Sequence, residues 1–155
     1  MLPLLVPLKE AGLDRINVSL DSLDPARFKQ VTLSNAYPQV IEAIHQALEM
    51  GFPMKLNMVA LAGLTAEDIF RFVQLAYDYP LEVRFLEFMP LCGSGWYPDL
   101  VFPIAEVRRV IRERFELTEE PDRKDQVAQT FTIAGGKGKV GLIASLTESF
   151  CNQCS

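Results

Sequence analysis

The 155-residue chain lacks any apolar run near the roughly 20 residues that a membrane span needs. Its start, residues 1–7, is too short and too interrupted by proline for a signal peptide. Basic residues are few, with 15 Lys and Arg against 20 Asp and Glu and a formal net charge of -5. Nucleic acids and anionic membranes call for concentrated Lys and Arg, so the charge balance argues against both as partners. We therefore expect a cytoplasmic protein.

Cysteine is also scarce, with only three in the chain. The number is odd, and Cys151 and Cys154 are separated by only two residues, which argues against a secreted disulfide framework. A CxxC pair can ligate one metal centre, but zinc ribbons, redox dithiols and iron–sulfur sites all use it. A thioredoxin-type dithiol normally precedes a helix, whereas this pair follows a predicted hairpin, which disfavours the redox interpretation. Cys92 is interpreted as a lone thiol.

The apolar residues, 49% of the chain, alternate between the helical and the strand period. This predicts an α/β fold with parallel strands. The expected helices cover residues 4–11, 37–50, 66–79 and 104–115, and the expected strands cover residues 15–20, 54–61 and 82–88. Asp24 and Pro25 open a short helical turn, and residues 91–99 form a structured loop.

A cluster of three glycines and one lysine, residues 135–138, separates two further strand-like runs at residues 129–134 and 139–144. This arrangement predicts an antiparallel hairpin. The cluster is not a phosphate-binding loop, because no helix follows it and the Walker spacing is absent.

Polar residues recur in or just after the three predicted strands between residues 15 and 90. Strand by strand they are Asn17, Ser19 and Asp21, then Lys55 and Asn57, then Glu87, which is grouped with the apolar Met89 two residues later. Each set shares one face, because side chains alternate along a strand. In a βα repeat helices cover the outer face, so a polar face lines a barrel interior or a cleft. The pattern predicts a site at the carboxyl ends of the strands, although a structural or solvated role is the alternative for each residue alone.

Two cationic residues each have two interpretations, and one histidine has a single one. Lys55 is flanked by apolar residues, so in a pocket it would need an anionic partner such as phosphate, unless it extends to solvent at a barrel rim. Arg84 permits the same two interpretations, with more weight on pairing to a neighbouring carboxylate. His45 lies on a helix anchored by apolar residues and is interpreted as a surface or boundary residue without a chemical role.

Five segments together resemble a known family. They are KEAGLDRINVSLDS at 9–22, KLNMV at 55–59, RFLEFMP at 84–90, GLI at 141–143 and SFCNQC at 149–154. In this order and spacing they resemble radical S-adenosylmethionine enzymes, specifically the GTP 3',8-cyclases of molybdenum-cofactor biosynthesis, the MoaA family. The resemblance covers nearly the whole chain.

The resemblance implies the second half of an incomplete (βα)6 TIM-like barrel over residues 1–100. Over residues 101–155 it implies the start of a C-terminal cluster-binding extension with a helix, a β-hairpin and the CxxC loop. It also implies a lyase that uses a 5'-deoxyadenosyl radical to rearrange GTP in the first step of molybdopterin synthesis. The parent enzyme would hold two [4Fe-4S] clusters and is compatible with a homodimer.

The resemblance assigns roles to five residues. In the family, the serine matching Ser19 and the methionine matching Met89 contact S-adenosylmethionine, and the lysine matching Lys55 contacts GTP. The cysteines matching Cys151 and Cys154 are two of the three ligands of the second [4Fe-4S] cluster. No residue of this chain is assigned to the catalytic step itself.

The chain also departs from the family pattern. The family's CxxxCxxC motif and the residues that should follow Cys154 are not in this sequence. We therefore expect a fragment that is inactive by itself, with an exposed sheet edge that favours association. Two alternatives stay open: another radical S-adenosylmethionine enzyme with an auxiliary cluster, such as a peptide-modifying one, and a zinc-binding interaction module that uses Cys151 and Cys154.

Overall fold

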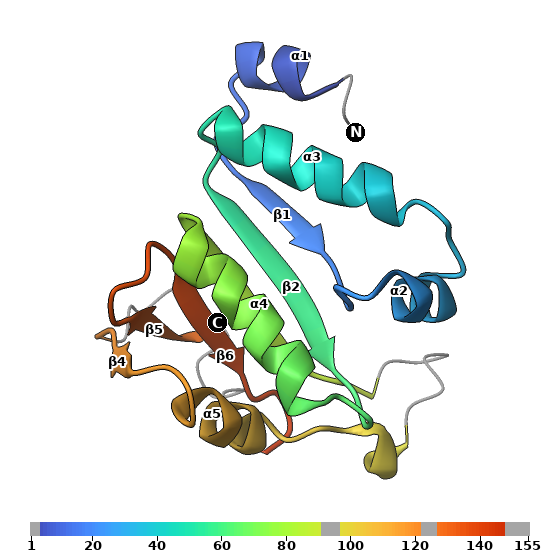
Figure 1. Ribbon diagram of the computed structural model, residues 1–155, viewed down its shortest axis with the longest axis vertical. Coiled ribbons are helices and arrows are strands. Elements are labelled where there is room, and N and C mark those ends of the chain that lie inside the picture. Colours follow the sequence, from blue (N-terminus) through green and yellow to red (C-terminus); the bar gives the residue numbers. More distant parts are fainter. Residues whose placement is uncertain (1–3, 91–96, 122–126, 148–155) are drawn as a thin grey trace.

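The computed structural model describes residues 4–90, 97–121 and 127–147 (Figure 1). Within these ranges the elements are α1 (Leu5–Glu10), β1 (Ile16–Ser19), α2 (Pro25–Thr32), α3 (Tyr37–Glu49), β2 (Met54–Ala60), α4 (Ala66–Asp78), β3 (Leu81–Glu87), the 3-10 helix η2 (Pro98–Leu100), α5 (Ile104–Arg112), β4 (Leu117–Glu119), β5 (Gln129–Ile133) and β6 (Lys139–Ile143). The six strands form one sheet in the order β1-β2-β3-β6-β5-β4. A mixed α/β fold is thereby confirmed.

The sheet has a parallel part and an antiparallel part. Strands β1, β2, β3 and β6 are parallel, and β5 runs antiparallel to β6 and to β4. The antiparallel pairing of β5 with β6 is the one that the glycine-rich segment predicts. Because β6 also pairs with β3, the antiparallel pair β5 and β6 continues the main sheet (Figure 1).

Helices cover one face of the sheet. Figure 1 shows α3 and α4 on the same side of the strands, and α4 buries Ile69, Phe72, Val73 and Ala76. Along β2 and β3, alternate residues are buried and the residues between them are only half-buried. This alternation means that one face packs on the helices and the other is partly open.

Local signals fix several helix ends. Thr65 and Asp68 form a capping box at the start of α4, as their spacing predicts. Helix α3 ends at Glu49, and Gly51 follows with φ of 74°, a conformation that glycine adopts without strain. Helix α2 is longer than the predicted short turn, because Asp24 caps it and Pro25 occupies its first turn.

The structure departs from the expected boundaries near residue 115. Helix α5 ends at Arg112, three residues earlier than predicted, and the short strand β4 was not predicted. Strand β4 has only three residues, two of which are exposed, so it has no apolar alternation that a sequence pattern can detect. Within the described ranges, no helix has the length and apolar character to cross a membrane.

Candidate functional site

The open face of the sheet carries two rows of side chains across the parallel strands. The first row is Asn17, Lys55, Glu82 and Lys139, and the second row is Ser19, Asn57, Arg84 and Gly141. Residues in register on neighbouring strands project to the same side. The structure therefore brings together the polar residues that the alternation predicts for the first two strands.

Glu82 joins two cations on this face. Lys55 Nζ lies 3.6 Å from Glu82 Oε2, and Arg84 Nε donates a hydrogen bond of 2.6 Å to Glu82 Oε1. The three side chains are only 31%, 14% and 18% exposed, in the order Lys55, Glu82 and Arg84. The predicted pairing of Arg84 with a neighbouring carboxylate is confirmed. The anionic partner of Lys55 in the described chain is a glutamate.

Gly141 leaves room for this ion pair. A Cβ atom at position 141 would lie 3.0 Å from Arg84 Cγ and 3.0 Å from Glu82 Oε1. Such contacts are tighter than Cβ atoms normally make, so a side chain at position 141 would displace the Glu82 and Arg84 side chains by a few tenths of an ångström. The glycine thus allows Glu82 and Arg84 to lie flat on the open face.

Asn57 carries an unsatisfied acceptor at the centre of the second row. Its Oδ1 atom is buried and has no hydrogen-bond partner within the described residues. The neighbour in register on β1 is Ser19, whose side chain is exposed. Because a buried acceptor without a donor costs free energy, this position suits a ligand or a water molecule that donates a hydrogen bond.

The carboxyl ends of β1 and β2 are held together beside this position. Asp21, just beyond β1, accepts a hydrogen bond of 3.0 Å from the backbone N–H of Val59. Met89 lies two residues beyond the end of β3, and its side chain is 40% exposed. Since β1, β2 and β3 are parallel, Ser19, Asp21 and Met89 all lie at the same end of the sheet, as predicted.

Glu87 does not belong to this face, and its predicted grouping with Met89 in a site-lining set is wrong. Its side chain is 1% exposed and lies on the helix-covered side, in step with the buried Phe85. It accepts hydrogen bonds from the backbone N–H of Ile104 at 3.0 Å and of Leu146 at 2.8 Å. Thr147 adds a backbone bond of 3.0 Å and a hydroxyl bond of 2.6 Å. Glu87 therefore joins the end of β3 to the start of α5 and to the segment after β6.

These contacts control the protonation of the carboxyl group. Burial by itself raises the pKa of Glu87, but the hydrogen bonds from Thr147, Ile104 and Leu146 together outweigh burial. The net result is a pKa below the ordinary value of 4.5. Glu87 is therefore a buried structural carboxylate that stays ionised near neutral pH.

The loop between β1 and α2 has its own hydrogen bonds. Asp24 accepts a bond of 2.8 Å from the backbone N–H of Arg27, which caps α2. The buried Ser22 accepts a bond of 3.0 Å from the backbone N–H of Asp24. These contacts fix the direction in which α2 leaves the carboxyl end of β1.

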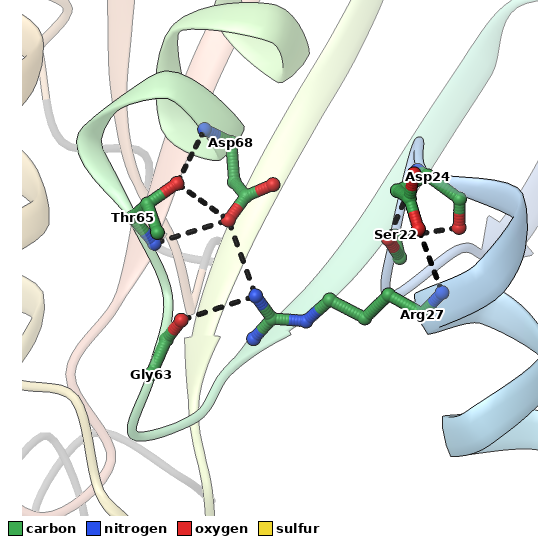
Figure 2. A network of polar contacts seen from close by, with 6 residues as sticks. All are labelled: Ser22, Asp24, Arg27, Gly63, Thr65 and Asp68. Atoms are coloured by element: carbon green, nitrogen blue, oxygen red, sulfur yellow. Dashed lines mark hydrogen bonds and ion pairs between the residues drawn. The ribbon is translucent and has the colours of Figure 1, made fainter.

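The Arg27 side chain connects this loop with the loop after β2, as Figure 2 shows. Its guanidinium donates to the Gly63 carbonyl at 3.1 Å and to Asp68 Oδ2 at 3.2 Å. The same Asp68 oxygen accepts from the backbone N–H and the hydroxyl of Thr65. Arg27 thus links two loops at the carboxyl end of the sheet, beside the predicted site.

Replacing Arg27 by Ala should lower the free energy of unfolding by about 1 kcal/mol, because two partly exposed charge-assisted contacts are lost. We expect faster amide hydrogen exchange around Gly63, with the rest of α4 unchanged. Urea unfolding and hydrogen exchange measure the two effects. Lys29→Ala on the same helix, which removes an exposed side chain, is the control. Equal effects of the two substitutions would show that the Arg27 contacts do not restrain the loop.

The predicted cluster ligands Cys151 and Cys154 lie outside the described residues, as does Cys92. In the parts of the chain that the structure describes, no three His, Cys, Asp or Glu side chains gather as a metal site would require. His45 is exposed and stacks edge-on against Tyr79, with ring centroids 5.8 Å apart, so its interpretation as a surface residue is confirmed.

Sequence reasoning missed two contributors to the open face. Glu82 was not considered, although Glu82 and Arg84 are two apart on a strand and so share a face. In the sequence, Gly141 is noticeable only as part of the GLI segment at 141–143. Its role depends on close approach of the Glu82–Arg84 pair, which no local pattern reveals.

Comparisons with known proteins divide the chain into two parts. Residues 4–76 match the model of the radical SAM superfamily. Residues 81–155 match the model named Molybdenum Cofactor Synthesis C. Both parts agree with the resemblance seen in the sequence segments.

Individual relatives match nearly the whole chain. The chain is 41% identical over 150 residues to GTP 3',8-cyclase, mitochondrial, of Arabidopsis thaliana, covering 96% of this chain and 38% of that protein. It is 40% identical over 151 residues to GTP 3',8-cyclase of Syntrophomonas wolfei, covering 96% of this chain and 46% of that protein. It is 38% identical over 154 residues to molybdenum cofactor biosynthesis protein 1 of Bos taurus, covering 98% of this chain and 24% of that protein. The chain thus spans less than half the length of each relative.

Proposed function

Because this chain belongs to the family of the GTP 3',8-cyclases within the radical SAM superfamily, we propose that it serves GTP cyclisation in molybdenum-cofactor biosynthesis. The observation that carries the proposal is the identity to named cyclases along 96% of the chain. The superfamily implies an iron–sulfur cluster and S-adenosylmethionine as the partners of the reaction. The open polar face of the sheet supports the proposal by offering groups suited to a charged substrate.

Ser19, Asn57 and Met89 are the proposed contacts of S-adenosylmethionine. The unsatisfied Oδ1 of Asn57 suits the hydrogen-bond donors of this ligand, which carries an ammonium group and an adenine amine. Ser19 is in register with Asn57, and Met89 lies at the same end of the sheet. The residues present therefore fit the ligand in the chemistry of their donors and acceptors.

Lys55 is the proposed contact of the GTP phosphates. Its side chain is 31% exposed on the open face, and its Nζ atom lies 3.6 Å from Glu82 Oε2. An ammonium has three donors, so Lys55 can contact a phosphate oxygen in addition to Glu82. Arg84 binds Glu82 through Nε, and its terminal guanidinium nitrogens have no partner among the described residues. These nitrogens can donate to a second oxyanion.

Cys151 and Cys154 are the proposed thiolate ligands of a [4Fe-4S] cluster. Thiolates at CxxC spacing fit iron–sulfur ligation and also zinc, and the family favours iron. The clusters and S-adenosylmethionine would supply the one-electron chemistry when bound. The proposed contribution of this chain is to bind and orient the nucleotide on the open face.

Several finer features remain part of the proposal. We propose that residues 1–100 form half of an incomplete (βα)6 barrel and that residues 101–155 begin a cluster-binding extension. A second cluster and a homodimer belong to the same proposal. A cytoplasmic location stays a prediction, and the name of the Arabidopsis relative places that protein in the mitochondrion.

A chimera tests the function. The chain replaces the matching 150 residues of the Arabidopsis cyclase, and the chimera is expressed in cells that lack GTP 3',8-cyclase. We expect restored activity of a molybdenum-cofactor enzyme. A soluble chimera that loads iron and binds S-adenosylmethionine but neither binds GTP nor restores activity would contradict the proposal.

Within this chimera, Lys55→Ala should weaken GTP binding by about tenfold or more, because a charge-assisted contact is lost. S-adenosylmethionine binding should change by less than about twofold, because Ser19, Asn57 and Met89 remain. Equilibrium dialysis of both ligands measures the two affinities. Equal losses for both ligands would contradict the role of Lys55.

A further inference from the structure

A pocket of about 390 Å³ opens at the amino-terminal edge of the sheet, away from the carboxyl ends discussed above. The strands β1, β2, β3 and β6 begin at this edge. The charged residues that line the pocket are Arg15, Lys55, Glu82, Lys137 and Lys139. Four cations and one carboxylate therefore face the same space, in a chain whose net charge is -5.

The four cations differ in how far they are already neutralised. Lys55 pairs with Glu82, and Lys139 Nζ lies 2.5 Å from Glu120 Oε1. The side chains of Arg15 and Lys137 are exposed and have no partner among residues 4–90, 97–121 and 127–147. Positive charge thus remains uncompensated at these two exposed side chains, the outer cations of the pocket, more than at the half-buried Lys55 and Lys139.

The backbone holds both outer cations in place. The N–H of Lys137 donates to the Tyr77 carbonyl at 3.0 Å, and the next residue, Gly138, donates to the Ala76 carbonyl at 2.7 Å. Arg15 directly precedes β1, whose first residue, Ile16, donates to the Pro53 carbonyl at 3.0 Å. Long side chains on fixed backbone positions around one pocket can reach a common anion with little rearrangement of the chain.

We propose that Arg15 and Lys137 recognise the outer phosphates of a polyphosphate chain and so determine how many phosphates the substrate carries. The proposal rests on the proposed function in one respect, that Lys55 contacts the phosphates of GTP. A phosphate beside Lys55 occupies the inner part of the pocket, and the next phosphates extend towards Arg15 and Lys137. Each added phosphate brings further negative charge to cations that have no other partner.

The experiment compares phosphate chains of different length. The unchanged 155-residue chain and its double variant Arg15→Gln with Lys137→Gln are each titrated calorimetrically with inorganic triphosphate, diphosphate and monophosphate. We expect the affinity for triphosphate to fall about tenfold, because the loss of each exposed charged contact lowers the affinity by a factor of about three. The affinity for monophosphate should fall less than about twofold. Circular dichroism verifies that the exposed substitutions leave the fold unchanged.

The matched control is Lys29→Gln with Arg112→Gln, which removes one lysine and one arginine from exposed positions outside this pocket. If the control loses as much triphosphate affinity as the pocket variant, net charge explains the effect and the proposal is wrong. Equal losses for triphosphate and monophosphate, or no loss for either, would also overturn it.

The same substitutions in the chimera separate this inference from the proposed function. GTP affinity should fall about tenfold, as for inorganic triphosphate, and GMP affinity should change little. If inorganic triphosphate binding depends on Arg15 and Lys137 but GTP does not bind the chimera, the phosphate pocket stands and the GTP function fails. If GTP binds the chimera equally with and without both cations, the pocket assignment fails and the function stands.

Discussion

Glu87→Ala is expected to lower the free energy of unfolding by about 3–5 kcal/mol, more than any other single side-chain truncation proposed above. The buried carboxylate accepts hydrogen bonds from Ile104, Leu146 and Thr147. After truncation, these N–H groups lose their acceptor inside the protein, and a cavity remains. Urea unfolding followed by circular dichroism measures the loss.

The control for this prediction is Glu42→Ala, which removes an exposed carboxylate from α3. Its expected effect is within about 0.5 kcal/mol. Comparable losses for Glu87→Ala and Glu42→Ala would show that the buried hydrogen bonds contribute little to stability.

The same residue predicts a pH dependence. The folded pKa of Glu87 is lower than the ordinary value of 4.5, so the folded state binds fewer protons at this site than the unfolded state. Its stabilising contribution is complete above the ordinary pKa and is lost as the pH falls through the folded pKa. Glu87→Gln, which keeps the shape but cannot ionise, should flatten this part of the stability curve. Urea unfolding of both proteins at about pH 7 and about pH 3.5 measures the difference.

Gly138→Ala should be the second severe substitution, with a loss of about 3 kcal/mol or more. A Cβ atom at position 138 would lie 2.1 Å from the Leu81 carbonyl oxygen and 2.7 Å from those of Ala76 and Tyr79. All three atoms belong to the backbone, so no side-chain rotation relieves the clash. Thermal unfolding or soluble yield measures the effect.

Gly51→Ala separates a steric effect from a conformational one. Gly51 has φ of 74°, but nothing lies within 4 Å of its added Cβ atom. The expected loss is about 1–2 kcal/mol, the cost of a left-handed conformation for a residue with a side chain. A loss at position 138 no larger than at position 51 would refute the steric argument.

The sequence predicts most of the helices and parallel strands, because their apolar residues follow the period of the element and caps such as Thr65 mark the ends. The predicted grouping of Glu87 with Met89 was wrong for a physical reason. Glu87 alternates in step with Val83 and Phe85 and opposite to Arg84, so it faces the helices, and its hydrogen-bond partners show how a carboxylate is satisfied on that covered side.

Sequence reasoning was also limited where the contact is distant in the chain. The pairing of β6 with β3 joins residues more than fifty positions apart, and no local pattern indicates it. The same holds for the contact of Arg27 with Gly63 and for the packing of Gly141 against Glu82 and Arg84. The polar face, in contrast, follows directly from the alternation of Asn17 with Ser19 and of Lys55 with Asn57.

The place of β6 between β3 and β5 has a consequence for synthesis on the ribosome. Strands β1 to β3 emerge before β6, so the second edge of β3 stays without hydrogen-bond partners until residues 139–143 have left the exit tunnel. An uncovered strand edge can pair with another nascent chain, and closing so long a loop slows the correct pairing. During translation of α5, β4 and β5 this edge of β3 is therefore open to aggregation.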